Sequence, residues 1–357
     1  MNQSRPRQFS CSSCAGKLEF APGTSSLKCP HCGHLEAIPE SDVDISERDF
    51  AQALRHQAAG ADTEVVATVH CDSCGATTDK PQDLVAFECV FCGSPIVTQP
   101  ADSVRIRPAS LLPFAINRDV AIEGFRSWIA GLWFAPNNLK QRARIDGQVN
   151  GVYLPHWTYD SHTTTHYRGQ RGEYYTTTET YTQDGETRTR QVTKTRWYDA
   201  AGVVYNSFDD VLVSASRSLP QSVSRSLEPW DLHALVPYSD EFLPGFLCES
   251  YQIDIEAGFE HAKDAMAPEI EAAIRRDIGG DVQRISTSES SYHDVSFKHI
   301  LLPLWIATYR YNDEPFRFLV NARTGEVQGS RPISWIKVTL AALAAAGVAA
   351  AAYYYLN

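Results

Sequence analysis

The sequence predicts an α+β protein with two N-terminal four-cysteine zinc ribbons, a duplicated helix-plus-antiparallel-strand domain with an inserted β-hairpin, and one C-terminal transmembrane helix. Three observations predict this architecture: two matched sets of cysteine pairs, a helix-then-strand pattern that occurs twice, and an uncharged apolar stretch at the C-terminus. We expect a first ribbon at 1–40, an acidic helical linker at 41–64, a second ribbon at 65–100, the duplicated domain at 101–332 and the membrane anchor at 333–357.

Eight of the nine cysteines fall into two sets with identical spacing, in which fourteen residues separate one CxxC pair from the next. Zinc binds four thiolates tetrahedrally, and a hairpin of this length brings two CxxC turns to one ion. Gly33, Gly75 and Gly93 each follow a ligand cysteine, where a positive φ is needed. A redox CxxC is the alternative, but that chemistry uses one pair. We therefore expect two zinc ions per chain, bound by Cys11, Cys14, Cys29 and Cys32 and by Cys71, Cys74, Cys89 and Cys92.

The charge of the chain argues against nucleic-acid binding by the ribbons. The net charge is −11, and the second ribbon carries one lysine, Lys80, against four acidic residues, Asp72, Asp79, Asp83 and Glu88. Phosphate binding requires a basic face. Protein contact is the better prediction for the ribbons, whose metal mainly stabilises a domain too small for a core. With four cysteines in each set, we expect His31, His34 and His70 to be solvated neighbours rather than ligands.

The linker between the ribbons predicts a short amphipathic helix. Ser46, followed three residues later by Asp49, resembles a capping box, and Phe50 and Leu54 then share one face. Gly60 is expected to end the helix, which we predict packs on a ribbon; a docking helix is the second choice.

The region after Pro100 contains a diverged internal repeat. Residues 121–126, AIEGFR, open a predicted helix that is followed by a strand containing VYLPHW at 152–157. Residues 255–260, IEAGFE, open a second helix, and ILLPLW follows at 300–305. Because proline cannot donate to a strand ladder, Pro155 and Pro303 are expected to mark a strand start or edge.

A polar hairpin is inserted into the first copy, at about 165–200. Thr and Tyr alternate with polar residues there, and Asp184-Gly185 is a strong hairpin-turn signal. Since both faces are polar, the hairpin should project from the domain. It is a candidate partner surface, with a merely solvated protrusion as the alternative.

No catalytic constellation stands out, and we expect no enzymatic activity. His156, His162 and His166 with Asp160 could suggest a metal site, but an extended strand separates the outer two by roughly 33 Å. Cys248 lies in an apolar stretch and is expected to be a buried core thiol. The sequence has no GxxxxGK[ST], GxGxxG or HExxH motif.

The C-terminal stretch Val338–Leu356 has the length of a membrane span, roughly 28 Å as a helix. Arg331 and Lys337 precede it and no charge follows, which predicts a cytoplasmic N-terminal part and a single-pass protein of the inner membrane. No apolar run precedes the first cysteines, so no cleavable signal peptide is expected, and the cysteines should stay reduced. Small residues spaced by four along the span leave homo-oligomers or helix–helix packing open.

The region before the tail contains Leu302-Pro303-Leu304-Trp305 with Tyr309 and Tyr311, Val320-Asn321 with Thr324-Gly325, and Gly329 with Pro332. With the four CxxC pairs and the tail, these features make the chain resemble a family of bacterial membrane-anchored double zinc-ribbon proteins, often labelled TFIIB-type zinc ribbon or primosomal-helicase-like proteins. Ala322 departs from the glycine of that family. The helicase label would rest on the ribbons alone, since this chain has no motor motif. The resemblance implies SPFH (flotillin-like) or phage-shock-type membrane proteins as neighbours.

We therefore expect a non-enzymatic, tail-anchored zinc-ribbon adaptor or scaffold that recruits proteins at the cytoplasmic face of the membrane, in a membrane-stress or SPFH-type complex. One alternative is a nucleic-acid-associated zinc-ribbon factor, which would need a basic face that the composition does not offer. The other is a hydrolase hidden in the α+β domain.

Overall fold

The computed structural model describes residues 9–41, 43–56, 63–80, 86–97, 99–139, 144–183, 186–312 and 314–356. Helices and strands are both present, as the α+β prediction requires, and the apolar C-terminal stretch forms one helix. The bounds of the N-terminal elements are β1 (Glu19–Phe20), β2 (Ser26–Lys28), β3 (Leu35–Ala37), β4 (Arg48–Asp49), α1 (Phe50–His56), β5 (Thr63–His70), β6 (Thr77–Asp79), β7 (Ala86–Glu88), β8 (Pro95–Val97) and β9 (Ala101–Ile106).

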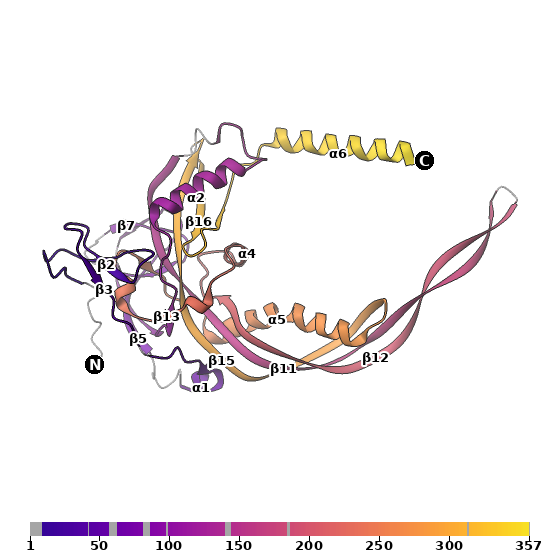
Figure 1. The fold of residues 1–357 in the computed structure, drawn as a ribbon, viewed down its shortest axis with the longest axis horizontal. Helices are drawn as coiled ribbons and strands as arrows, with labels where there is room; N and C mark the ends of the chain where they lie inside the picture. Colours follow the sequence, from indigo (N-terminus) through magenta and orange to yellow (C-terminus); the bar gives the residue numbers. More distant parts are fainter. Residues whose placement is uncertain are drawn as a thin grey trace.

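The larger elements follow, and they build the body of the molecule (Figure 1). They are β10 (Ser110–Leu111), α2 (Arg118–Gly131), β11 (Arg144–Gln183), β12 (Glu186–Ser214), α4 (Gln221–Ser226), η1 (Leu232–Ala234), β13 (Val236–Pro237), η2 (Asp240–Phe242), β14 (Leu247–Cys248), α5 (Ile255–Ile278), β15 (Val282–Tyr311), β16 (Glu314–Asn321), β17 (Val327–Gly329) and α6 (Trp335–Leu356).

One sheet dominates the body, with the strand order β12-β11-β15-β10-β13. Strands β14, β16 and β4 add to its sides, and β17 continues it beyond β16. Strands β11 and β15 pair antiparallel along almost the whole length of β15, from Gly172–Val282 to Arg144–Arg310. This long pair is the axis on which the other elements are placed.

The two prolines lie inside long strands, so the expectation that they start or edge a strand is wrong. Leu154 pairs with Leu302, which puts Pro155 and Pro303 near each other in the centre of the sheet. On its other side, β11 pairs with β14 up to Tyr153 and with β12 from His156 onward. Pro155 falls in the gap between these two partners, where its missing N–H is not needed.

Pro303 lies in the matching gap of β15. Strand β10 pairs with β15 at Ile300 and Leu301, and β16 pairs with β15 from Leu304 onward. Each proline carbonyl accepts a backbone hydrogen bond from the other side, from Ala215 at 3.0 Å for Pro155 and from Ala322 at 3.1 Å for Pro303. The ladder therefore continues past both prolines.

Both helices that the internal repeat predicts are present, and each covers part of the sheet. Helix α2 begins after the N-cap Asn117, three residues before the predicted start, and stacks Phe125 on Phe318 with ring centroids 3.9 Å apart. Helix α5 begins after the N-cap Asp254 and buries one face against the inner part of β11 and β12. Pro268 is accommodated inside α5, which runs to Ile278.

The predicted hairpin is much longer than residues 165–200, because β11 and β12 pair from His156–Ser214 outward to Gln183–Glu186. Its inner part is covered by α5, whereas the part beyond Gly172, which pairs with the first residue of β15, projects alone (Figure 1). We call this outer part, Glu173–Gln183 with Glu186–Arg196, the arm. The Asp184-Gly185 turn lies outside the described residues.

The linker helix forms as α1, but its cap differs from the prediction. The carboxylate of Asp49 accepts a hydrogen bond from the amide of Gln52, so Asp49 rather than Ser46 caps the helix. Phe50 packs on Phe259 of α5, with ring centroids 4.9 Å apart, and therefore on the body rather than on a ribbon. The predicted end at Gly60 lies outside the described residues.

Candidate metal centres

Both predicted cysteine sets converge on a point. In each set the four Sγ atoms lie within 4.8 Å of one another. The Sγ–Sγ distances are 3.6 Å for Cys11–Cys32 and 3.5 Å for Cys14–Cys29 in the first set. In the second they are 3.6 Å for Cys71–Cys92 and 3.7 Å for Cys74–Cys89.

These distances fit a tetrahedral metal site. A tetrahedron with metal–sulfur bonds of about 2.3 Å has sulfur–sulfur edges of about 3.8 Å, whereas a disulfide joins sulfurs about 2.05 Å apart. All eight thiols are free. Each cluster could therefore hold one metal ion.

The turns that present the thiolates have the positive φ that was predicted at their glycines. Gly33, Gly75 and Gly93 adopt φ of 75°, 78° and 76°, and each amide donates to the carbonyl of the first cysteine in its turn. The fourth turn differs, since Ala15 occupies the equivalent place with φ 57°. A side chain at that φ is strained, so this turn is the least favourable of the four.

The histidines beside the ligands do not belong to the clusters. His31, His34 and His70 are exposed. His34 lies within hydrogen-bond distance of the Ser12 hydroxyl and 3.9 Å from Glu36, and His70 Nδ1 lies 3.1 Å from the Thr77 hydroxyl. The described clusters are complete with cysteine alone.

Both ribbons are docked on the body by apolar side chains. Phe20 of the first ribbon packs on Phe242, with ring centroids 5.3 Å apart. Phe91, between two ligands of the second ribbon, is fully buried in a cluster with Leu154 and Leu304 of the central sheet. The ribbons are therefore fixed parts of one body, seen at the left of Figure 1.

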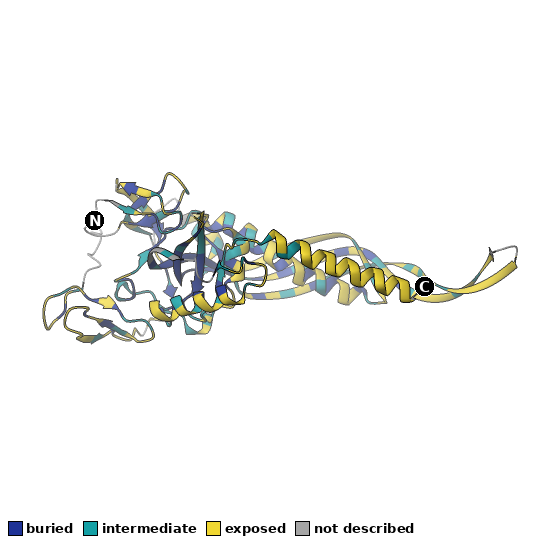
Figure 2. Cartoon of the chain, turned by 90° about the horizontal axis from the view of Figure 1, so that it is seen from above, coloured by how far each residue is buried: buried dark blue, intermediate teal, exposed yellow. Residues whose placement is uncertain are grey.

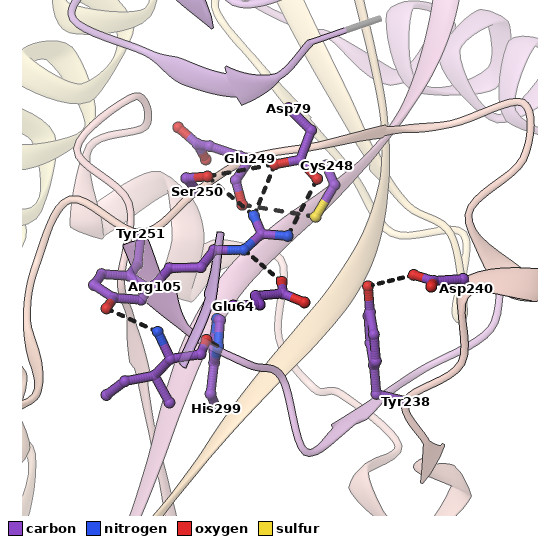
Figure 3. Close-up of polar contacts among 11 residues, drawn as sticks. Glu64, Asp79, Arg105, Tyr238, Asp240, Cys248, Glu249, Ser250, Tyr251 and His299 are labelled. Carbon is purple, nitrogen blue, oxygen red and sulfur yellow. Dashed lines mark hydrogen bonds and ion pairs between the residues drawn. The ribbon is translucent and has the colours of Figure 1, made fainter. Parts of the chain in front are cut away.

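A buried guanidinium ties the second ribbon to the body (Figure 3). Arg105 on β9, only 2% exposed, donates to Asp79 at 2.7 and 3.2 Å, to Glu64 at 2.8 Å and to Ser250 of the body at 3.0 Å. The next residue, Ile106, donates its amide to the Tyr251 hydroxyl at 3.1 Å. A buried charge is tolerated when it is paired and hydrogen-bonded in this way.

A second buried acid lies next to this network. Glu249 is 1% exposed, and it accepts hydrogen bonds from Ser218 and, at 3.1 Å, from Gln252. Burial raises the pKa of its carboxyl to about 7 despite these hydrogen bonds. Cys248 beside it is buried, as predicted, with its thiol 3.8 Å from the Glu249 carbonyl oxygen.

The histidines of β11 do not form a metal site in the described chain. His156 is buried, with Nε2 3.4 Å from the Ser224 hydroxyl, and burial lowers its pKa to about 4. His162 pairs across the sheet with His293, and His166 pairs with Glu289. Neither appears in a cluster with Asp160.

Sequence reasoning missed a carboxylate cluster, Glu47, Asp160 and Asp209, whose oxygens lie within 4.8 Å of one another. Lys298 neutralises part of it, at 3.1 Å from Glu47 and 2.7 Å from Asp210. Burial and a hydrogen bond to Glu47 raise the pKa of Asp160 to about 7. The members come from segments far apart in the chain, so no local pattern could have revealed them, and the lysine makes the cluster an ionic network.

The C-terminal helix is long and apolar enough to cross a membrane. The span Trp335–Tyr355 has a mean hydropathy of 1.7 and is 0% buried against the rest of the described chain. A core helix of a soluble domain would be mostly buried, whereas this one is exposed beyond its first turn (Figure 2).

The chain is similar to a Bacillus subtilis (strain 168) protein described as uncharacterized protein YdjG. The two are 25% identical over 343 residues, covering 92% of this chain and 91% of the relative. No family model matches the chain, and no solved structure matches it.

Proposed function

We propose that this chain is a tail-anchored, non-enzymatic zinc-ribbon scaffold that recruits proteins at the cytoplasmic face of the inner membrane. The observation that carries the proposal is the combination of two four-cysteine clusters docked on one body with an exposed C-terminal helix of membrane-spanning length. Four thiolates in tetrahedral arrangement are the set that structural zinc takes, so zinc is the proposed metal at both sites.

The ribbons act in this proposal as folding elements rather than as the recruiting surface. Their apolar side chains, Phe20 and Phe91, are used in contacts with the body. Arg105 further pairs with Glu64, the last residue of the linker, and with Asp79 of the second ribbon. Nucleic-acid binding is the less favoured alternative, because it needs a basic face and these residues are carboxylates.

The arm is the proposed partner surface, because it offers groups that the body does not use. The amide of Tyr174 still donates to the Asp281 carboxylate at 2.7 Å. Beyond it the β11 edge of the arm has no β15 partner, and β12 is the last strand of the described sheet. Unpaired strand edges accept an added strand from another protein. The arm extends about 36 Å over the eleven residue pairs from Glu173–Arg196 to Gln183–Glu186.

The two faces of the arm differ in chemistry, which would orient a partner. Cross-strand pairs such as Thr176–Thr193 and Thr180–Thr189 place eight threonines on one face. The other face is charged: Glu179 pairs with Lys194 at 2.8 Å, and arginines lie over tyrosine rings. An SPFH-type membrane protein is the partner class that the sequence resemblance suggests.

We also propose that the body arose by duplication of a helix-then-strand unit. In support, β14 pairs with Val152 and Tyr153 as β10 pairs with the matching Ile300 and Leu301. The indole of Trp157 donates to the Ile253 carbonyl at 2.9 Å, and the matching Trp305 donates to the Ile116 carbonyl at 2.8 Å. In both units this acceptor directly precedes the N-cap of the helix.

The direction of α6 has a consequence for anchoring. Helix α6 and the arm extend from the body in the same direction (Figures 1 and 2). A bilayer crossed by α6 in this orientation would also enclose the polar arm and the charged face of α5, which is prohibitive. Anchoring therefore requires α6 and the arm to leave the body in different directions.

Topology labelling tests the anchoring. A cysteine added after Asn357 is exposed to a membrane-impermeant thiol reagent on intact cells, and membranes are separated from cytosol. We expect the full chain in the membrane fraction and labelling of the added cysteine, whereas a chain ending at Arg331 should be soluble. Recovery of both chains in the cytosol, or labelling of the ribbon cysteines on intact cells, would refute the proposed topology.

A further inference from the structure

An apolar loop lies beside the first turn of α6. The loop Leu132–Pro136 follows α2, and its Trp133 and Phe134 side chains are 79% and 43% exposed. On the α6 side, Ile333, Trp335 and Ile336 are also exposed, at 53%, 73% and 76%. Large apolar side chains gathered in one patch mark an interaction surface.

Hydrogen bonds fix this loop to α6. The ammonium of Lys337 donates to the carbonyl oxygens of Trp133 at 3.0 Å and Ala135 at 2.7 Å. The amide of Ser334 donates to the Phe134 carbonyl at 2.8 Å. The loop and the first turn of α6 must therefore lie at the same depth relative to any bilayer that α6 enters.

We infer that the loop Leu132–Pro136 is a second membrane-contacting element, which places Trp133 and Phe134 in the lipid interface beside α6. The inference rests on the proposed anchoring. If α6 spans the bilayer, Trp335 and Lys337 lie at the headgroup level, where tryptophan and lysine are favoured. Trp133 and Phe134 are then held at that level by the bonds to Lys337 and Ser334.

A groove next to the loop suits lipid rather than water. It has a volume of about 630 Å³ and lies between the end of α2 and the start of α6. Its walls include Ile129 and Leu132 on one side and Leu340 and Ala341 on the other. Because Leu340 and Ala341 belong to the span, the groove is continuous with the acyl-chain region, and a phospholipid chain is the occupant that this continuity selects.

Contact of the loop with the membrane would also orient the body. Two attachment points, the span and the loop, hold the end of the body that carries α2 against the membrane. The arm leaves the body at a different place from the loop (Figure 1). Once its direction differs from that of α6, as anchoring requires, it remains in water, as its two polar faces require.

Site-specific photocrosslinking in the full-length protein tests the inference. A benzoylphenylalanine is placed at Trp133, at Leu343 within α6, or at Tyr205, which is 76% exposed and belongs to β12, a strand that lies apart from α6 (Figure 1). Each variant is reconstituted in vesicles of phosphatidylcholine and phosphatidylglycerol, irradiated and analysed by mass spectrometry. All three positions are exposed, so the variants should fold alike.

We expect phospholipid adducts at positions 133 and 343, in comparable yield, and none at 205. Adducts at 343 without adducts at 133 would overturn the loop contact while leaving the anchor intact. Protein adducts in place of lipid adducts at 133 would also overturn it. Absence of adducts at both 133 and 343 would overturn the anchoring on which the inference rests.

Discussion

Removing the guanidinium of Arg105 should release the second ribbon from the body. The Arg105→Met variant keeps most of the side-chain volume but leaves the Asp79 carboxylate buried without its cation. Breaking one partner of a buried pair costs about 3 to 5 kcal/mol. Arg126→Met is the matched control, because its ion pair with Glu123 is exposed on both sides and contributes at most about 1 kcal/mol.

Hydrogen exchange resolves the effect locally, as multidomain unfolding need not be two-state. Peptides covering β5 and β9 should lose about two to four orders of magnitude of protection in Arg105→Met, at 1.4 kcal/mol per factor of ten. Adding Asp79→Leu removes the uncompensated charge and should restore part of this protection. If the double variant loses as much as the two single variants together, an uncompensated buried charge is not the cause.

Cys29→Ser should lower the bound metal from two ions per chain to one and unfold the first ribbon only, because the two sets are separate; loss of both ions would contradict this. Ala15→Gly should slow metal loss from the first ribbon to a chelator, since relief of the positive φ stabilises it by about 0.5 to 1 kcal/mol. Glu249→Gln should flatten the pH dependence of stability. The pKa of Glu249 rises from 4.5, the ordinary value for a glutamate, to about 7 in the folded state. Between these two pH values the folded state keeps a proton that the unfolded state releases, so stability falls by about 3 kcal/mol as the pH rises through this range. Unfolding midpoints of both proteins between pH 5.5 and 8 give the difference, and parallel profiles would exclude Glu249 as the source.

The cysteine clusters could be predicted from sequence because their geometry is local. A CxxC turn brings two sulfurs together wherever it occurs, and a glycine such as Gly33 or Gly75 indicates the positive φ of the turn. The two helices and the strands after them were also predictable from periodicity. The positions of Pro155 and Pro303 inside strands could not be predicted in this way. A strand tolerates proline where a neighbouring strand is absent on one side, and that depends on the pairing of the whole sheet.

The remaining features depend on contacts between residues far apart in the chain. Arg105 meets Ser250 only after the second ribbon docks. Trp133 and Phe134 directly follow the predicted helix, and only the structure reveals that these large apolar side chains face outward. The length of the arm likewise follows from where β15 stops pairing, at Gly172, which no local pattern encodes.

Recruitment by the arm can be measured in one comparison. Replacing residues 174–195 with Asn-Gly joins the cross-strand partners Glu173 and Arg196 by a two-residue turn, which shortens the arm without changing its register. Full-length and shortened chains are purified from membranes in mild detergent, and their metal content and unfolding are compared first.

With two metal ions retained in both, a protein that is recovered stoichiometrically with the full-length chain should be lost with the shortened one. Equal recovery of the same protein by both chains would contradict the proposal that the arm is the recruiting surface of a membrane-anchored scaffold.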